Sequence, residues 1–252
     1  MSTVTTFDHI AIATHRMADA ATVLMSELGG VPAFGGDSEA YRFGQWRFAN
    51  GARLEVLEPR GAGGFLHRFL AQHGPGVHHV TFRVPDLRAA CARAQAAGHG
   101  IVGYDDSNPY WQEAFLHPRE AMGIVVQLAQ SRPMPPGRGP RWEPPPVPPG
   151  APPAISLVGL RLAARDAARA RRQWIEVLQG EASEGPAGEM IVRWPRSPLR
   201  LAVDVDPEAP EGPLALEIAA DRALVAEEPH PVLGVTLRSV KDDPQHHDGG
   251  PA

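Results

Sequence analysis

Four polar side chains stand at matching places in two stretches of the sequence and could together hold a metal ion. His9 lies in "DHIAIAT" and Glu55 in "RLEVLEP", 46 residues further on. His79 lies in "VHHVTFRV" and Gln127 in "GIVVQLAQ", 48 residues further on. Two imidazoles with two oxygen donors suit a divalent ion, and such a mixed set with open positions is typical of a catalytic site.

The alternation of apolar residues in these stretches predicts strands and indicates which side chains share a face. Ile10 and Ile12 form the apolar face of the first strand and leave His9 on the other face. The same alternation leaves His79 opposite the apolar face of its strand and turns His78 toward the core. In "RLEVLEP" and "GIVVQLAQ" the same alternation places Glu55 and Gln127 opposite the apolar face, which a helix is expected to cover.

Both stretches follow the same order of elements, which predicts an internal repeat. In residues 7–30, and again in residues 77–100, an alternating strand precedes an amphipathic helix that ends at glycine. Two strand candidates follow in each repeat, and in the first repeat the turn pair Asn50-Gly51 joins them. Each repeat therefore reads as strand, helix, strand, strand, with one further short strand left open.

Residues 7–130 resemble the vicinal oxygen chelate superfamily, which includes glyoxalase I, methylmalonyl-CoA epimerase, extradiol dioxygenases and bleomycin-resistance proteins. The resemblance rests on "DHIAIAT", "ARLEVLEP", "GPGVHHVTFRVPDL" and "FLHPREAMGIVVQL", and it is closest to the methylmalonyl-CoA epimerase type. It implies an α+β fold in which paired βαβββ modules form a cup-shaped mixed sheet. It also implies one divalent metal ion (Zn, Ni, Co, Mn or Fe) that is held by His9, Glu55, His79 and Gln127.

The position of the carboxylate departs from the family pattern. Metal-dependent isomerases of the family commonly carry a carboxylate on the last strand, where this chain has Gln127, and the carboxylate stands at Glu55 instead. We therefore expect an enzyme, a metal-dependent lyase or isomerase, in which Glu55 is catalytic and moves a proton next to a metal-chelated carbonyl or thioester. Arg83 shares a face with His79 and is a candidate for binding a substrate carboxylate. Trp111 is a second candidate for contact with the substrate.

Two other functions stay open. A bleomycin-resistance-like protein would bind a small molecule without chemistry, and it would need none of the four ligand-type residues. A ring-cleaving dioxygenase would use His9, His79 and Glu55 as a set of two histidines and one carboxylate. The dioxygenases of the family keep that carboxylate on the last strand, so the chain fits them less well.

A proline-rich segment divides the chain and predicts its domains. Residues 132–154 should be extended and semi-rigid, because prolines cannot donate backbone hydrogen bonds. The prediction is a metal-binding domain at 1–131, this linker, a second domain at 155–240 and a flexible tail at 241–252.

The second domain echoes the first and is predicted to be a degenerate pair of modules, with an unrelated small α+β domain as the alternative. Its sequence aligns with the first half, but the four ligand positions hold residues that could not serve together in a metal site: Gly159, Ala202, Ala215 and Arg238.

The composition indicates which kinds of partner and which cellular compartment to expect. The 252-residue chain has a formal net charge of -5, which argues against nucleic acid or an anionic membrane as its main partner. Its single cysteine, Cys91, excludes an internal disulfide framework and fits a reducing compartment. We find no pattern of a signal peptide and no membrane-spanning apolar run. We therefore expect a cytoplasmic protein whose partner is a small carbonyl or acyl-CoA compound, with a homodimer left open.

Overall fold

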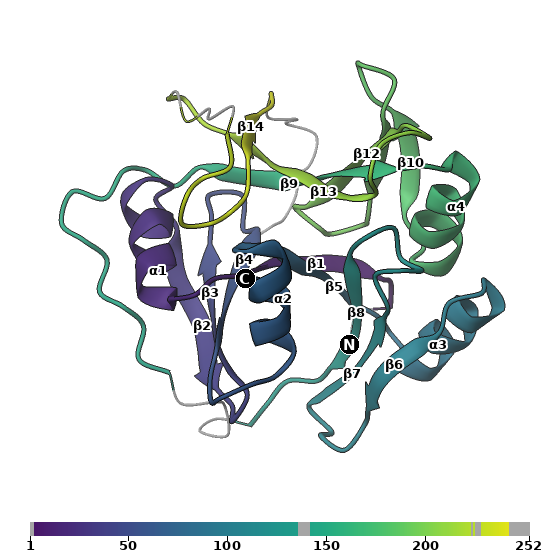
Figure 1. The fold of residues 1–252 in the computed structure, drawn as a ribbon, viewed down its shortest axis with the longest axis horizontal. Coiled ribbons are helices and arrows are strands. Elements are labelled where there is room, and N and C mark those ends of the chain that lie inside the picture. Colours follow the sequence, from purple (N-terminus) through teal and green to yellow (C-terminus); the bar gives the residue numbers. More distant parts are fainter. Residues whose placement is uncertain (1–2, 136–141, 223, 225–227, 242–252) are drawn as a thin grey trace. The chain divides into compact units, whose positions relative to one another are not determined.

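The strands of the chain form two hydrogen-bonded sheets, and helices accompany both (Figure 1). The computed structural model describes residues 3–135, 142–222, 224 and 228–241. Within them the element order repeats the predicted βαβββ pattern, which confirms the α+β fold class with paired modules and a second, degenerate pair. None of the helices in this described part is long and apolar enough to cross a membrane.

The first sheet and its helices account for the chain up to the proline-rich segment. In chain order the elements are β1 (Thr6–Ala13), α1 (Met17–Ser26), β2 (Val31–Asp37), β3 (Tyr41–Arg47), β4 (Arg53–Pro59), α2 (Phe65–His73), β5 (Gly76–Arg83), α3 (Leu87–Ala96), β6 (Ile101–Asp105), β7 (Trp111–Leu116) and β8 (Val125–Ser131).

The second sheet follows the proline-rich segment. Its elements are β9 (Ser156–Ala164), α4 (Ala167–Arg171), the π-helical turn η1 (Arg172–Val177), β10 (Glu181–Glu184), β11 (Met190–Arg193), β12 (Arg200–Val205), β13 (Gly212–Ala219) and β14 (Leu237–Ser239).

The strand order of the first sheet places two modules side by side. The order is β2-β3-β4-β1-β5-β8-β7-β6, so the first and last strands of each module are neighbours near the centre. Both of these pairs are parallel. In the pair of β1 and β4, Ala11 lies opposite Glu55. In the pair of β5 and β8, Thr81 lies opposite Gln127. The short strands that the sequence left open are β2 and β6, which form the two edges.

The helix that follows the first strand ends where the glycines predict. Gly29 adopts a positive φ of 70°, which glycine reaches without the steric penalty of a side chain. The backbone N–H of Leu28 bonds to the carbonyl of Val23, and that of Gly30 bonds to the carbonyl of Leu24 at 2.8 Å, so the last turn of α1 is closed. The helix packs on β3 and β4.

A helix between the two modules, α2, was not identified from the sequence. It buries Leu66 and Leu70, which are four residues apart, against Ala13 and Leu57 of the sheet. Because residues four apart lie on one helix face, this pair was the available signal.

The second sheet repeats the arrangement with parts missing. Its order is β10-β11-β12-β9-β13-β14, and the fourth module contributes only β13 and β14. These two strands pair in parallel, with Leu216 opposite Leu237. Among the described residues between them there is no helix.

The chain forms two compact units that each combine segments from both of its halves. The described segments of the first unit are residues 3–8, 79–135 and 159–214, and the second unit holds the other described residues. The domain boundaries predicted along the sequence stay a prediction.

An aromatic cluster forms part of the core of the first unit. Phe7 stacks on Phe82 with ring centroids 4.8 Å apart, and Trp194 lies 4.7 Å from Phe82. All three side chains are fully buried, and Ser197 donates a hydrogen bond of 2.6 Å to the carbonyl of Phe7. The start of β1 is therefore fixed by packing and by a buried hydrogen bond.

In the second unit a tryptophan from the proline-rich segment lies on the sheet. A side chain at Gly35 would place its Cβ 2.5 Å from the ring of Trp142, so the glycine makes room for the indole. The same indole stands edge-on to buried Trp46, with ring centroids 6.2 Å apart. The proline-rich segment thus packs on β2 and β3 through Trp142.

Replacing Trp142 with alanine should weaken the fold. We expect Trp142→Ala to lower the free energy of unfolding by about 1–3 kcal/mol, less than for a fully buried ring because this one is half-buried. Urea unfolding measures the change, with Val147→Ala as a matched control, since Val147 lies in the same segment and is 48% exposed. Equal stability of the two variants would contradict this role for the indole.

Candidate metal centre

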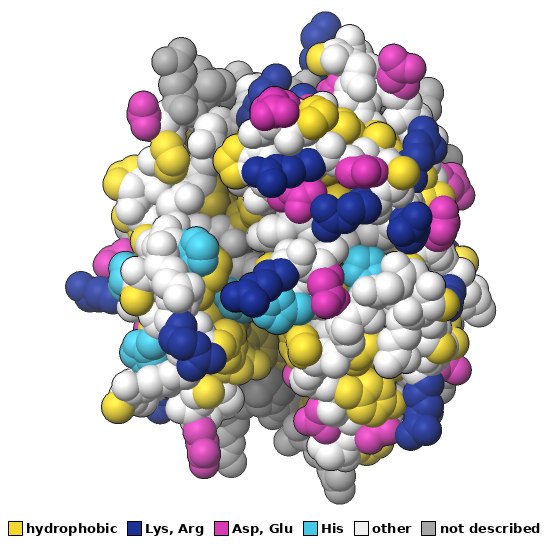
Figure 2. Space-filling model, turned by 45° about the vertical axis from the view of Figure 1, so that its right-hand side comes forward, with side chains coloured by type: hydrophobic (Ala, Val, Ile, Leu, Met, Phe, Trp, Pro, Cys, Tyr) yellow, Lys and Arg dark blue, Asp and Glu magenta, His cyan; other side chains and the backbone are white. Residues whose placement is uncertain are grey.

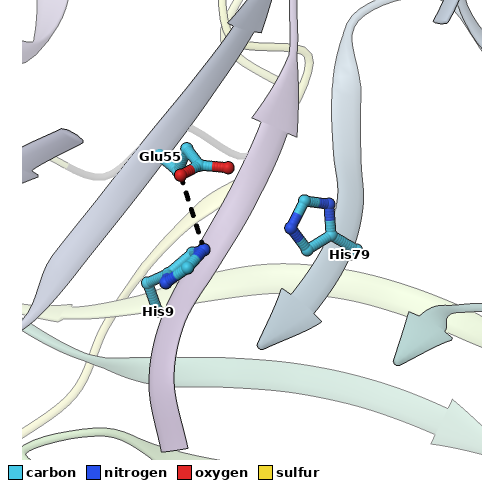
Figure 3. Close-up of side chains that lie close together, drawn as sticks. All are labelled: His9, Glu55 and His79. Atoms are coloured by element: carbon cyan, nitrogen blue, oxygen red, sulfur yellow. Dashed lines mark ion pairs between the residues drawn. The ribbon is translucent and has the colours of Figure 1, made fainter. Parts of the chain in front are cut away.

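The side chains of His9, Glu55 and His79 come together in the structure (Figure 3). They belong to β1, β4 and β5, which are consecutive in the order of the first sheet. One ligand atom of each lies within 4.8 Å of the others, and the residues are 2%, 7% and 6% exposed. Three of the four predicted ligands therefore form one buried group.

The donor set fits a divalent ion. Two ligands about 2.1 Å from one ion lie at most about 4.2 Å apart, so atoms within 4.8 Å of one another need only small movements to share it. Two imidazoles and one carboxylate suit zinc, nickel, cobalt or iron better than calcium or magnesium, which prefer oxygen ligands. The shell would be open to further ligands.

The backbone register explains why a histidine and an oxygen donor share a face. Glu55 pairs with Ala11, and His9 stands two residues before Ala11 on the same face of β1. Gln127 pairs with Thr81, two residues after His79, in the same way. The second module repeats this relation without change.

A glutamine that sequence reasoning missed holds the carboxylate of the group. The Nε2 of buried Gln45 donates a hydrogen bond of 2.8 Å to Glu55 Oε2, and His9 Nε2 lies 3.6 Å from the same oxygen. Gln45 pairs with Glu55 across the hairpin that turns at Asn50-Gly51. Counting outward from that turn would have predicted Gln45 as the neighbour of Glu55.

Gln127, the predicted fourth ligand, forms hydrogen bonds with Thr81 and Glu113. It is 7% exposed, and its Oε1 accepts a hydrogen bond of 2.6 Å from the hydroxyl of Thr81. Its Nε2 donates to Glu113 Oε2 at 2.7 Å. Glu113 was not identified from the sequence, and the role of Gln127 as a ligand stays a prediction.

Neither predicted substrate-binding residue belongs to the group of three. Arg83 Nε lies 2.7 Å from the carboxylate of Asp8, so its charge is already paired and a substrate carboxylate would have to compete. Trp111 is half-buried, and its Nε1 donates a hydrogen bond of 2.7 Å to Glu113. Substrate contact by Arg83 and Trp111 stays a prediction.

His78 contacts α2, the helix that the sequence analysis missed, so its predicted direction toward the core stays a prediction. Its ring packs against Phe65 and Phe69 of α2, with centroid distances of 5.4 and 4.9 Å. Burial lowers the pKa of His78 from 6.5 to about 4, against the opposing effect of the Glu55 charge, so the ring is neutral at physiological pH.

The equivalent positions of the second sheet are filled differently. Ala202 pairs with Arg161, two residues after Gly159, so the register of the first sheet is kept. No side chain fits at Gly159, because its Cβ would collide with the backbone carbonyl of Arg200. Among the described residues no second group of His, Cys, Asp and Glu has the geometry of the first.

A buried ion pair occupies this part of the second sheet. The guanidinium of Arg161 contacts the two carboxylate oxygens of Asp204 at 2.7 and 2.6 Å, and Glu189 lies 3.4 Å away. The sequence analysis missed it, because it aligned ligand positions and not the residues beside them.

Comparison with known proteins gives a consistent family. The model of the glyoxalase/bleomycin resistance protein/dioxygenase superfamily matches residues 8–115. An ethylmalonyl-CoA/methylmalonyl-CoA epimerase of Cereibacter sphaeroides is 32% identical over 85 residues, which are 31% of this chain and 61% of the epimerase. The chain thus spans less than two thirds of that relative.

Two further matches extend the comparison. The uncharacterized protein YqjC of Bacillus subtilis is 30% identical over 131 residues, which cover 50% of this chain and 91% of YqjC. A solved structure of a 4-hydroxymandelate synthase variant from Streptomyces coelicolor matches with a TM-score of 0.60 and 15% identity. It covers 87% of this chain and 72% of the synthase chain, which shows a shared fold that includes both sheets. The chain belongs to the glyoxalase/bleomycin resistance protein/dioxygenase superfamily.

Proposed function

We propose that the protein is a metal-dependent lyase or isomerase that moves a proton next to a carbonyl or thioester group. The observation that carries the proposal is the buried group of His9, Glu55 and His79, with ligand atoms within 4.8 Å of one another. A protein that only sequesters a ligand has no need of such a group.

The residues divide the work between binding and proton transfer. His9, His79, Glu55 and Gln127 would hold the ion, which when bound acts as a Lewis acid toward the substrate carbonyl. Glu55 takes the proton from the neighbouring carbon, since it is the one carboxylate of the group. Gln45 anchors one oxygen of that carboxylate and so fixes its orientation.

The substrate class follows from the relatives and from the surface charge. The similarity to an ethylmalonyl-CoA/methylmalonyl-CoA epimerase supports an acyl-CoA thioester or a related small carbonyl compound. On the face drawn in Figure 2, acidic and basic side chains are interspersed, which does not favour nucleic acid as a partner. A cytoplasmic location and a homodimer remain part of the proposal.

An iron-dependent oxygenase is the second candidate, because the donor set is two histidines and one carboxylate. The match to a 4-hydroxymandelate synthase supports the fold of such an enzyme and no more. Oxygen consumption by the iron-loaded protein, without proton exchange, would favour this candidate over the first.

Metal content tests the site itself. Protein purified without a histidine tag should carry close to one equivalent of divalent metal, since the second sheet offers no equivalent group among its described residues. His79→Ala should weaken metal binding by about 100-fold or more, because even residues behind a ligand contribute 10- to 100-fold. Elemental analysis and chelator competition measure this, with exposed His15→Ala as control. Metal-free protein that still binds small molecules would indicate a binding protein.

Proton exchange tests the role of Glu55. In deuterated water the wild-type protein should exchange the hydrogen next to the carbonyl of an acyl-CoA substrate. Glu55→Gln keeps an oxygen ligand but cannot take a proton, so exchange should fall by about 10²- to 10⁴-fold while most metal is retained. Mass spectrometry follows the deuterium, and the exposed Glu39→Gln serves as control. Undiminished exchange in Glu55→Gln would remove this residue from the mechanism.

A further inference from the structure

We infer that Glu113 is a positioning residue that turns the amide oxygen of Gln127, and not its nitrogen, toward the bound metal. This inference rests on the proposed function, because it presupposes that Gln127 faces an ion. Glu113 itself touches neither the substrate nor the metal in this account and acts through Gln127.

A glutamine side chain can present either of two nearly equal faces to an ion. Its Oε1 accepts hydrogen bonds and can bind a cation, whereas its Nε2 donates two hydrogen bonds and repels one. The two orientations differ by a half turn of the amide, so the surroundings determine which atom faces the metal. A neutral ligand at position 127 therefore needs a partner that fixes this turn.

Glu113 is such a partner, because a carboxylate accepts hydrogen bonds. Its Oε2 receives two donors, Gln127 Nε2 at 2.7 Å and Trp111 Nε1 at 2.7 Å. An indole N–H can only donate, so Trp111 keeps the carboxylate oriented as an acceptor toward Gln127. The half-turned amide would bring its oxygen against the carboxylate and lose this bond.

Thr81 alone could not fix the orientation of the Gln127 amide. Its hydroxyl donates to Gln127 Oε1 at 2.6 Å, but a hydroxyl can donate or accept and would serve either orientation. With the nitrogen held by Glu113, the oxygen receives the Thr81 hydroxyl and keeps a second lone pair for a cation. Glu113 is thus the group that sets the direction.

The strand register places Glu113 on the correct face. It pairs with Ala129, while Phe115 pairs with Gln127, so Glu113 is two residues along β7 on the same side. The corresponding position on β3 is Phe43, where no carboxylate stands behind the ligand strand. The first module thus has its carboxylate, Glu55, among the candidate ligands. In the second module the carboxylate of Glu113 instead accepts a hydrogen bond from the amide of Gln127.

Two variants at position 113 separate positioning from simple charge. Glu113→Gln removes the charge, but its amide oxygen can still accept both hydrogen bonds. Glu113→Leu removes the charge and also the acceptor for both hydrogen bonds. We expect metal affinity, measured by chelator competition with zinc, to fall about 10- to 100-fold in Glu113→Leu and to stay close to wild type in Glu113→Gln. Gln112→Ala, on the same strand with the opposite orientation, is the matched control and should bind as wild type.

The orientation of Gln127 can also be followed without metal. Its side-chain NH₂ signals in the ¹⁵N spectrum of the metal-free protein should shift in Glu113→Leu and return toward the wild-type position in Glu113→Gln. Unmoved signals in the leucine variant would overturn the inference. So would equal metal affinities of the leucine variant and wild type, or equal losses in both variants. A wild-type protein that binds no metal would refute the proposed function instead.

Discussion

Parallel pairing of the first and last strands of a module controls which side chains can meet in this protein. In each such pair the oxygen-bearing residue stands opposite a residue two places after the histidine, so both side chains lie on one face. Because the side-chain period of a strand is two, a slip of one residue would turn either group into the core. The register is in turn fixed by the buried apolar face, where Ile10, Ile12, Val80 and Phe82 are all fully buried.

The second sheet keeps this register but has none of the ligand-type side chains at the equivalent positions. The residues opposite Glu55 and Gln127 are small in the first sheet, Ala11 and Thr81. At the same place the second sheet has Arg161, whose guanidinium is neutralised by Asp204 and Glu189. A buried guanidinium needs paired carboxylates, since an unpaired charge in the interior is strongly destabilising. The second sheet thus places the cationic guanidinium of Arg161 at this position.

Much of the fold could be predicted from the sequence because its signals are local. Alternation located β1, β4, β5 and β8, and glycines marked the ends of α1 and α3. The three-residue group could be predicted as well, because His9, Glu55 and His79 lie on strands whose apolar faces are unambiguous.

What sequence reasoning missed depends on contacts between distant residues. The place of Glu113 depends on the register of β7 with β8, and the segment that joins these strands turns through Met122 and Gly123, both at positive φ. Such a turn has no simple counting rule, unlike the hairpin beside Gln45. The pairing of Arg83 with Asp8 and the docking of Trp142 join segments without any periodic pattern, so only the folded chain reveals them.

X-ray absorption of the metal-loaded protein tests the central claim most directly, because it reports which atoms surround the ion. The account predicts two imidazole nitrogens and oxygen ligands at about 2.0–2.2 Å, with the multiple scattering that histidine rings produce. A spectrum with oxygen ligands alone, or with one imidazole, would show that His9 and His79 do not share an ion and would contradict it.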